Sequence, residues 1–201
     1  SNICIVLGRV GKVEEELEIQ NIRMDHVPVF RRSSGGGTVV QGPGCLNFTF
    51  VLSKDRQPQI ADLHASYRVI LNPIIDLLGS VGVQARFCPV SDLAFSGTDR
   101  KFSGNAQRRA RKFVLHHGTL LYGMDLALFE RYLKIPASMP EYRQNRGHAE
   151  FVQNLPLTGH DLRQLLITHS AFDSVEHQLE PFEQELLEKE RLKNKWIVFR
   201  Q

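Results

Sequence analysis

The chain has 201 residues, of which 42% are hydrophobic and 23% are charged, and its formal net charge is +3. These ordinary values exclude a chain that is disordered, collagen-like or coiled-coil throughout, and the length suits one domain with a sizeable core. A net charge this small does not by itself indicate a nucleic-acid or membrane partner.

Targeting and cysteine signals are weak. No apolar run approaches the roughly 18 residues of a membrane span, and no basic-then-apolar leader opens the sequence. We therefore expect a soluble, cytoplasmic protein without a membrane partner. Cys4, Cys45 and Cys88 form no CxxC pair and are odd in number, which argues against a disulfide framework and a thiolate zinc site.

The first quarter of the chain is rich in strand signals. Residues 3–7 form a β-branched apolar run, which predicts a buried strand that either lies at a sheet edge or follows residues outside this sequence. Residues 13–24 carry a weak helical pattern with acidic residues early. Residues 27–30 and 47–52 are β-favouring runs on either side of a glycine-rich stretch.

That stretch, residues 31–47, reads RRSSGGGTVVQGPGCLN and predicts a strand, a glycine turn and a strand. Glycine tolerates positive φ and lacks a Cβ, so the turn could present peptide N–H groups to an anionic ligand, with Arg31 and Arg32 just upstream. The alternative is a hairpin that only needs flexible residues.

The remaining pattern predicts an α+β fold. Residues 60–81 have the spacing of an amphipathic helix that covers one face of a sheet, and Pro73 should kink or split it. Glycines or polar turns separate four β-favouring segments, residues 83–87, 92–96, 101–107 and 113–122. Helices are expected at residues 124–133, 160–172 and 181–193, with a terminal strand at 195–199. The prediction is a mixed, mostly antiparallel sheet packed with helices.

A basic segment occupies residues 100–112. Such a run is usually a solvated face or a charged edge strand, but it can bind phosphate or an acidic partner. Lys101 stands apart because the small residues Ser103, Gly104 and Ala106 leave room for a ligand beside it. The basic residues are Arg100, Lys101, Arg108, Arg109, Arg111 and Lys112.

The histidine pair at 116 and 117 does not indicate a metal site, because adjacent residues of a strand point to opposite faces. A core histidine with a satisfied hydrogen bond is the better interpretation. The sequence also lacks the GxxxxGK[ST], GxGxxG and GxSxG motifs. A nucleotide, if one binds, must bind the sheet and its glycine turn.

Four motifs in this order, RRSSGGGTV, GPGCLN, KFSGNAQRR and HHGTLL, resemble the lipoate-protein ligase and octanoyltransferase family, which shares its catalytic fold with biotin protein ligases. The resemblance covers residues 5–155 and, more loosely, the rest. It implies that residues 1–201 are a single catalytic domain, without some of the residues that usually precede the first strand and without the accessory C-terminal domain. Gln41 and Gly42 stand where many of the ligases have a histidine–aspartate pair.

The resemblance also implies the site. Lys101 is the expected catalytic residue, in contact with the bound acyl group or adenylate. The other residues expected to bind the acyl-adenylate are Arg32, Ser34, Gly35, Gly36, Gly37, Thr38, Val39, Asp92, Ser103, Gly104, Ala106, Arg108, His117 and Gly118.

Three functions remain open. The first is a ligase that activates lipoate or octanoate with ATP, with Mg²⁺ held through the phosphates, and acylates a lysine on a lipoyl domain of a 2-oxoacid dehydrogenase complex or on the glycine cleavage H protein. Some relatives of this short form need a separate accessory protein.

The second function is an octanoyltransferase that takes its acyl group from acyl carrier protein through a thioester on Cys88, without ATP. A buried structural thiol is, however, the simpler interpretation of Cys88. The third is a non-catalytic module that binds lipoyl domains or carrier protein. Nucleic acid is disfavoured because only Phe102 and Phe113 interleave the basic segment.

Overall fold

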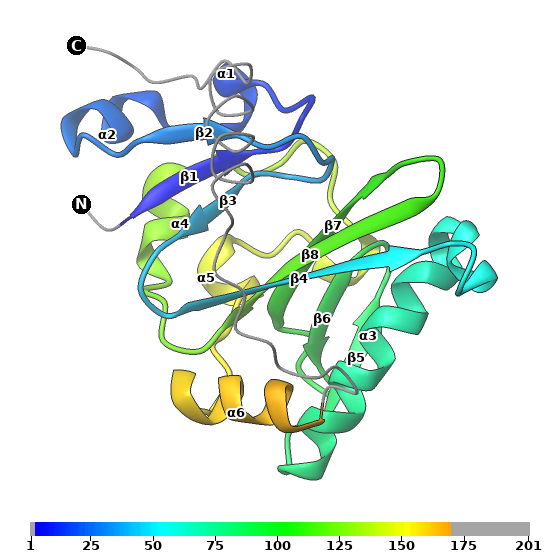
Figure 1. The fold of residues 1–201 in the computed structure, drawn as a ribbon. Helices are drawn as coiled ribbons and strands as arrows, with labels where there is room; N and C mark the ends of the chain where they lie inside the picture. The colour runs from blue at the N-terminus through cyan, green and yellow to red at the C-terminus, as the bar shows by residue number, and fades with distance from the viewer. Residues whose placement is uncertain (1–2, 170–201) are drawn as a thin grey trace, which may run out of the picture.

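Two β-sheets organise residues 3–169, which are the residues that the structure, a computed structural model, describes (Figure 1). The smaller sheet has the order β2-β1-β3, and the larger sheet has the order β4-β8-β7-β6-β5. Every neighbouring pair in the larger sheet is antiparallel, so the predicted α+β fold with a mostly antiparallel sheet is confirmed. The strands are β1 (Cys4–Leu7), β2 (Val29–Arg31), β3 (Val39–Gln41), β4 (Cys45–Ser53), β5 (Ala85–Cys88), β6 (Asp92–Phe95), β7 (Lys101–Arg109) and β8 (Phe113–Leu121).

The smaller sheet corrects two expectations. Strand β1 is its middle strand, parallel to β2 and antiparallel to β3, so the edge placement was wrong. Strands β2 and β3 lie on opposite sides of β1, and β4 belongs to the larger sheet. The glycine stretch is therefore not a hairpin turn. Residues 32–38 form a loop that crosses the end of β1, and we call it the glycine loop.

The predicted helix at residues 13–24 is divided into α1 (Val13–Glu16) and α2 (Ile19–Met24). Between them Leu17 is extended, fully buried and bridged to Leu133. The weak helical pattern is overridden here because burying Leu17 in this bridge requires an extended backbone.

One long helix, α3 (Leu63–Ser80), packs on the larger sheet and follows the short η1 (Pro58–Ala61). The carboxylate of Asp62 caps it by accepting a hydrogen bond from the N–H of Ala65 at 2.7 Å. The helix continues through Pro73 and is not split. Its buried side chains, Tyr67, Ile70, Leu71, Ile74 and Leu78, join the core of that sheet, as the predicted covering helix requires.

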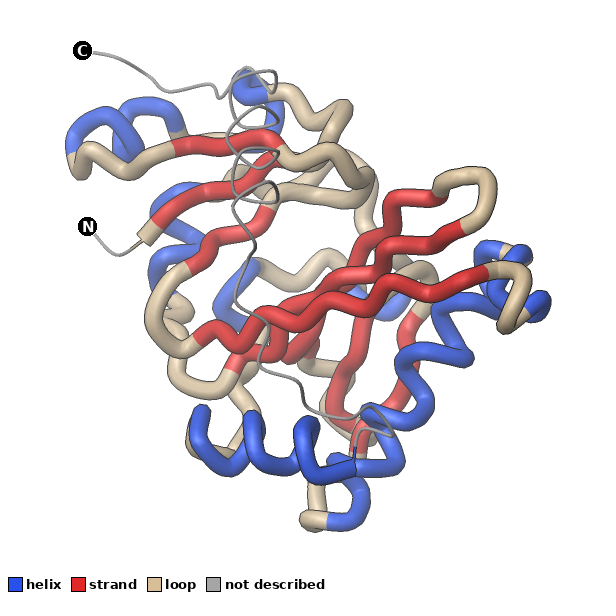
Figure 2. Tube along the Cα trace, viewed as in Figure 1, coloured by secondary structure: helices blue, strands red, loops and turns tan. Residues whose placement is uncertain are grey.

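The last part of the described chain is mostly loop and short helix (Figure 2). The helices predicted at 124–133 and 160–172 appear as α4 and α6. The end of the second helix beyond residue 169, the predicted helix at 181–193 and the predicted strand at 195–199 lie outside the described residues. Among the described helices, none is long and apolar enough to cross a membrane. The elements are α4 (Ala127–Tyr132), η2 (Glu141–Arg143), α5 (His148–Phe151) and α6 (Gly159–His169).

Candidate active site

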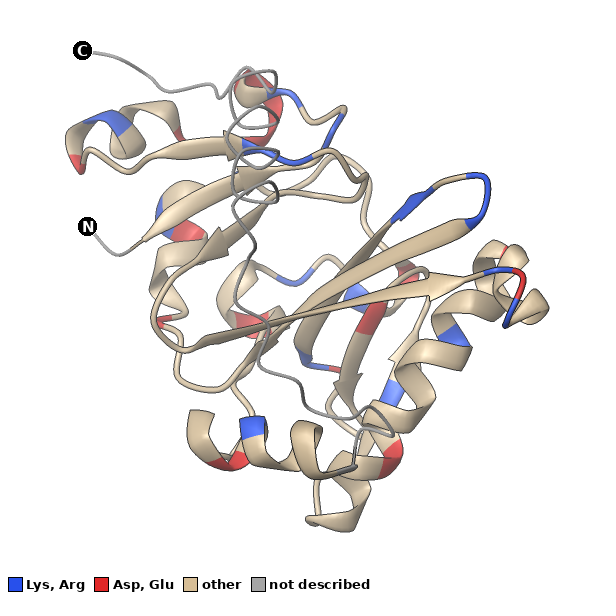
Figure 3. Ribbon diagram, viewed as in Figure 1, with Lys and Arg blue, Asp and Glu red and all other residues tan. Residues whose placement is uncertain are grey.

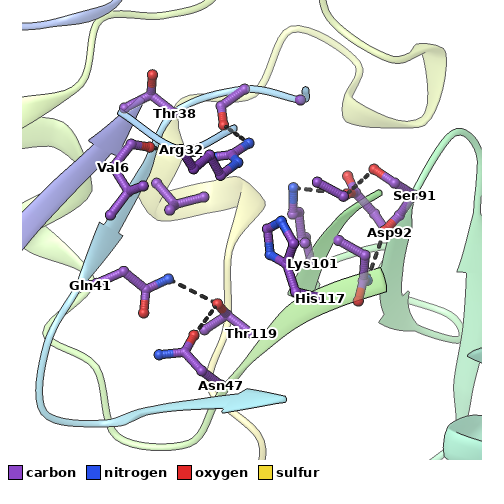
Figure 4. A pocket seen from close by; sticks show the side chains of 16 residues that line it. Val6, Arg32, Thr38, Gln41, Asn47, Ser91, Asp92, Lys101, His117 and Thr119 are labelled. Atoms are coloured by element: carbon purple, nitrogen blue, oxygen red, sulfur yellow. Dashed lines mark hydrogen bonds and ion pairs between the residues drawn. The ribbon is translucent and has the colours of Figure 1, made fainter. Parts of the chain in front are cut away.

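A cavity of about 340 Å³ lies where the glycine loop and the smaller sheet face strands of the larger sheet (Figure 4). A concave site with several polar groups converging on it is the usual form of a ligand pocket. Of the residues expected to bind a ligand, the cavity brings together Arg32, Gly36, Gly37, Thr38, Val39, Asp92, Lys101, Gly104, Ala106 and His117. Its other lining residues are Val6, Gln41, Asn47, Ser91, Asn105 and Thr119.

The glycine loop packs tightly against the end of β1 at Gly36. This residue has a φ of +86°, in the left-handed region that glycine adopts without steric cost. A Cβ built on Gly8 would lie 1.9 Å from the carbonyl oxygen of Gly36, so the close approach needs glycine at position 8. At Gly35 and Gly37, by contrast, an added Cβ meets no atom within 4 Å. The loop thus depends on Gly8 and Gly36 more than on the rest of the GGG motif.

Arg32 holds the glycine loop in shape, while Arg31 holds the turn that follows β1. Nη2 of Arg32 donates hydrogen bonds to the carbonyl oxygens of Gly35 at 2.7 Å and Gly37 at 2.8 Å. Nη1 of Arg31 donates to the carbonyl oxygens of Gly8 at 2.8 Å and Gly11 at 2.7 Å. Burial lowers the pKa of Arg32. Most of the guanidinium donors that we expected to face an anion are therefore engaged by backbone carbonyls, although Arg32 still lines the cavity.

A β-bulge directs Lys101 into the cavity. The register between β6 and β7 shifts so that Leu93 pairs with Ser103 while Ala94 pairs with Lys101. Phe102, the extra residue, is fully buried in the core. Regular alternation from Gly104 would turn Lys101 away from the cavity, and the added residue turns it back.

The ammonium group of Lys101 lies 2.9 Å from Oδ1 of Asp92, and the hydroxyl of Tyr142 donates to Oδ2 of the same carboxylate at 2.6 Å. Burial, followed by the charge of Asp92, raises the pKa of Tyr142. An added Cβ at Gly104 would come within 3.1 Å of Nζ of Lys101, so this glycine makes room for the ion pair. Tyr142 lies in η2, after α4, and nothing in the sequence pattern indicated that it would reach the site.

The histidine pair divides between two faces, as the alternation of a strand requires. His117 lines the cavity, and its Nε2 lies 2.6 Å from Oγ of the buried Ser34, which joins the glycine loop to β8. Burial and then the charge of Arg32 lower the pKa of His117. Ser34 thus supports the cavity from behind and does not line it.

His116 lies on the opposite face and is fully buried. The amide nitrogen of Gln107 is 3.2 Å from its Nδ1, which leaves Nε2 to donate to Oδ1 of Asn105 at 3.3 Å. Burial, with a smaller contribution from His117, lowers the pKa of His116 to about 4. His116 is therefore the satisfied core histidine that the sequence favoured.

The other expected site residues lie outside the cavity lining. Gly118 is required by packing, because an added Cβ would lie 1.9 Å from Oδ1 of Asn105. Ser103 is buried and accepts a hydrogen bond from Asn105 at 3.2 Å. Arg108 is exposed farther along β7, and Gly35 lies in the loop just before the lining residues.

Cys88, the candidate nucleophile, is fully buried in β5 and does not line the cavity. Burial raises the pKa of its thiol to about 11. A nucleophilic cysteine needs an accessible thiolate, so this environment is unfavourable for a thioester intermediate.

Sequence reasoning missed a polar chain at one end of the cavity. Nε2 of Gln41 donates to Oγ1 of Thr119 at 2.8 Å, and that hydroxyl donates to Oδ1 of Asn47 at 2.7 Å. Oε1 of Gln41 is buried and has no hydrogen-bond partner among the described residues. The strand pairing of Asn47 with Thr119 places them side by side, but such a pairing is not readable from either segment alone.

The chain is similar in sequence to proteins of one known family. The family model described as the lipoyl protein ligase A/B catalytic domain matches residues 1–171. The chain is 34% identical to a probable lipoate-protein ligase A of Mycoplasma pneumoniae over 131 residues, which are 65% of this chain and 37% of that protein. It is 28% identical to the lipoate-protein ligase LplJ of Bacillus subtilis over 171 residues, or 82% of this chain and 50% of that protein.

Solved structures share the fold. A bipartite lipoate protein ligase from Thermoplasma acidophilum, described with its E2 lipoyl domain, superposes with a TM-score of 0.79 at 23% identity, over 94% of this chain and 75% of the other. A lipoate-protein ligase A bound with ATP gives a TM-score of 0.79 at 22% identity, over 94% and 77% of the two chains. The chain spans between about a third and a half of the length of the curated relatives that it matches.

Proposed function

The chain belongs to the lipoyl protein ligase A/B catalytic-domain family, and from that premise we propose that it activates lipoate or octanoate with ATP and transfers the acyl group to a lysine of a lipoyl domain. Curated relatives are named lipoate-protein ligases. Similar structures are described as bound with ATP or lipoic acid, and one as a bipartite ligase with its E2 lipoyl domain.

The observation that carries the proposal is the convergence of Lys101 and the glycine loop on one cavity. In the first step a carboxylate oxygen attacks the α-phosphorus of ATP, and pyrophosphate leaves. In the second step the neutral amine of the acceptor lysine attacks the acyl carbonyl, AMP leaves and the amine loses a proton. Both steps develop negative charge on phosphate or carbonyl oxygens.

The residues of the cavity suit that charge. No hydrogen bond from the N–H groups of Gly36 and Gly37 to another described residue is present, so these groups can donate to phosphate oxygens. The ammonium of Lys101, held by Asp92, can stabilise the carbonyl oxygen as it becomes negative. His117 and Ser34 connect the two walls, which keeps these donors in fixed relation.

Magnesium would be carried mainly by the nucleotide. Asp92 is the sole carboxylate among the cavity-lining residues, and its oxygens already accept from Lys101 and Tyr142. Within residues 3–169 there is no group of three or more His, Cys, Asp or Glu side chains that could hold a metal ion. Mg²⁺ bound through the phosphates would neutralise part of their charge.

The test is the intact mass of a purified apo lipoyl domain after incubation with this protein. One reaction contains lipoate, ATP and Mg²⁺, and the other contains octanoyl acyl carrier protein without ATP. We expect a lipoyl mass gain that depends on ATP. An octanoyl gain without ATP would instead establish the transferase, and Cys88→Ser would then test its nucleophile.

An accessory polypeptide is part of the same test, because the chain spans only part of its curated relatives. A pyrophosphate-release assay without acceptor measures the first step by itself. If lipoyl-AMP added from outside supports transfer while ATP and lipoate do not, the chain performs the second step and needs a partner for the first. Failure with both donors and with added lipoyl-AMP would leave the non-catalytic binding module.

A further inference from the structure

The cavity face of the larger sheet continues outward beyond the cavity. Paired residues in an antiparallel sheet point to the same side, and alternate residues of a strand share a face. His117, which lines the cavity, pairs with Thr49, and the next pair outward on that face is Leu115 with Val51. Phe113 pairs with Ser53 beyond it, and Arg108 of β7 pairs with Leu115. We call Thr49, Val51, Arg108, Phe113 and Leu115 the outer face.

Three of the five residues of the outer face are apolar, and two of these are well exposed. Val51 is 64% exposed and Phe113 is 49% exposed. On the opposite side of the same strands, Val114 and His116 are fully buried, and the ring of Tyr67 from α3 contacts His116 edge-on at 5.4 Å. One side of these strands is thus packed by the protein itself while the other offers apolar groups to solvent, which is a mark of an interaction surface.

A basic rim borders the outer face at the turn between β7 and β8 (Figure 3). Arg108, Arg111 and Lys112 are exposed, and none of them takes part in an ion pair between described residues. Lys54 adds charge beside them, since its Nζ donates to the carbonyl oxygen of Ala110 at 2.7 Å. Asp55 directly follows Lys54, and a single carboxylate beside these four basic residues leaves the rim positive overall.

We propose that the outer face is the docking surface for the acceptor domain, a protein domain that presents apolar groups and carboxylates around its acceptor lysine. This inference rests on the proposed function and deepens it. Transfer requires the lysine to enter the cavity while its domain stays on the surface, and the outer face adjoins the cavity on the same side of the sheet. The positive rim favours an acidic partner by charge complementarity.

A nucleic-acid partner fits this surface less well. Strands that bind single-stranded nucleic acid present a series of aromatic platforms among basic residues. On the outer face Phe113 is the single aromatic residue, and it has no aromatic neighbour there. The surface is better matched to a protein that buries Val51, Leu115 and Phe113 against its own apolar side chains.

The experiment measures binding of a purified apo lipoyl domain, chosen for an excess of Asp and Glu over Lys and Arg, by isothermal titration calorimetry with the full chain. Two variants test the surface, Val51→Glu for its apolar part and Arg111→Glu for its rim. Their matched controls are Val81→Glu, at a 46% exposed valine after α3, and Arg163→Glu, at an exposed arginine of α6.

We expect Val51→Glu to raise Kd about tenfold or more, because truncating or charging a central interface contact is costly. Arg111→Glu should raise Kd about fivefold in 50 mM NaCl and less in 500 mM NaCl, because salt screens exposed charges. Both controls should stay within about twofold of the unsubstituted protein. The charge can also be swapped on the partner. When one acidic residue near the acceptor lysine of the lipoyl domain is changed to Lys, that domain should bind the Arg111→Glu variant more tightly than the original lipoyl domain binds it, because the opposite charges are restored.

Three results would overturn the docking surface. The first is equal Kd values for all four variants, and the second is no binding of the lipoyl domain to the unsubstituted protein. The third is a change in oligomeric state with Val51→Glu in analytical ultracentrifugation, because this would make the outer face an interface between copies of the chain. Pyrophosphate release without acceptor separates this proposal from the function, since Val51 and Arg111 lie outside the cavity lining. If the unsubstituted protein releases no pyrophosphate and transfers no acyl group but binds the domain through the outer face, the docking surface stands and the catalytic proposal fails.

Discussion

The two walls of the cavity are built on different principles. The glycine loop is shaped by hydrogen bonds from the Arg32 side chain to its backbone carbonyls, and what it offers a ligand is backbone N–H groups. The wall formed by β6, β7 and β8 offers side chains, and these are held by other side chains, as Lys101 is by Asp92. We therefore expect changes in the loop to act mainly through its shape and stability, and changes in the sheet wall to act mainly through chemistry.

The largest effect should follow the loss of the sheet wall's cation. In Lys101→Met the stem keeps its apolar volume but loses the ammonium group, and a preorganised donor of this kind is worth about 3 kcal/mol, or roughly a hundredfold in rate. The control is Lys12→Met, because Lys12 is exposed and, within residues 3–169, forms its ion pair with Glu15 on the surface. The measurement is the rate of acyl transfer from added lipoyl-AMP, followed by intact mass. Full activity of Lys101→Met would remove Lys101 from its assigned role.

Acid should destabilise the packing behind the sheet wall. A histidine ordinarily titrates near 6.5, and burial lowers the pKa of His116 to about 4. Between these values the unfolded chain binds a proton that the folded chain does not, so the free energy of unfolding falls as the pH is lowered from about 6.5 to about 4. The loss from His116 is on the order of 3 kcal/mol, and the lowered pKa values of His117 and His148 act in the same direction.

Guanidinium unfolding at a series of pH values measures this loss, and NMR titration of the imidazole signals assigns it. A signal of His116 that titrates near its ordinary pKa would contradict the buried, neutral imidazole hydrogen-bonded to Asn105 and Gln107.

The loop wall should respond to shape. Gly8→Ala places a Cβ where the carbonyl oxygen of Gly36 lies, so the loop must shift, and we expect a loss of about 2 kcal/mol of stability, as for other overpacked sites. Gly35→Ala faces open space and should change stability by less than about 0.5 kcal/mol. Unfolding midpoints in guanidinium provide the comparison. Equal losses in the two variants would mean that the loop does not depend on the close approach at Gly8.

The fold was largely predictable because its strong signals are local. Alternation and turn residues located β5 to β8, and helical spacing located α3. The failures came from long-range pairing. The bridge from Leu17 to Leu133 divided a helix, and the insertion of β1 between β2 and β3 turned an expected hairpin into a crossing loop. In each case the segment whose structure changes carries no sign of the distant strand or residue with which it pairs.

The site was predictable where a motif places residues on one strand or loop. Lys101, Gly104 and Ala106 were expected together and do share the cavity, while Ser103 points the other way because it lies on the opposite face of β7. The bulge at Phe102 has no sequence signature that distinguishes it from a regular strand. Thr119 shares the cavity face of β8 with His117 by simple alternation, but Asn47 and Tyr142 reach the site through strand pairing and tertiary contacts, which periodicity cannot find.

The smallest effect tests whether a contact behind the sheet wall serves its chemistry. In Tyr142→Phe the ring keeps its packing on Phe151, whose centroid is 5.2 Å away, while Asp92 loses the hydrogen bond at Oδ2 and keeps Lys101 at Oδ1. A hydrogen bond to a charged group is worth about 1.5 kcal/mol or more, so both stability and the transfer rate should fall, the rate by about tenfold.

Tyr132→Phe is the matched control. The hydroxyl of Tyr132 donates at 2.8 Å to the carboxylate of Asp25, and that carboxylate is also paired with a cation, Arg131. None of these three residues lines the cavity. The control should lose stability without losing rate. Equal rate losses in the two variants would mean that the Tyr142 hydroxyl contributes to stability alone, whereas a loss confined to Tyr142→Phe would show that orienting Asp92, and through it Lys101, is part of how this wall works.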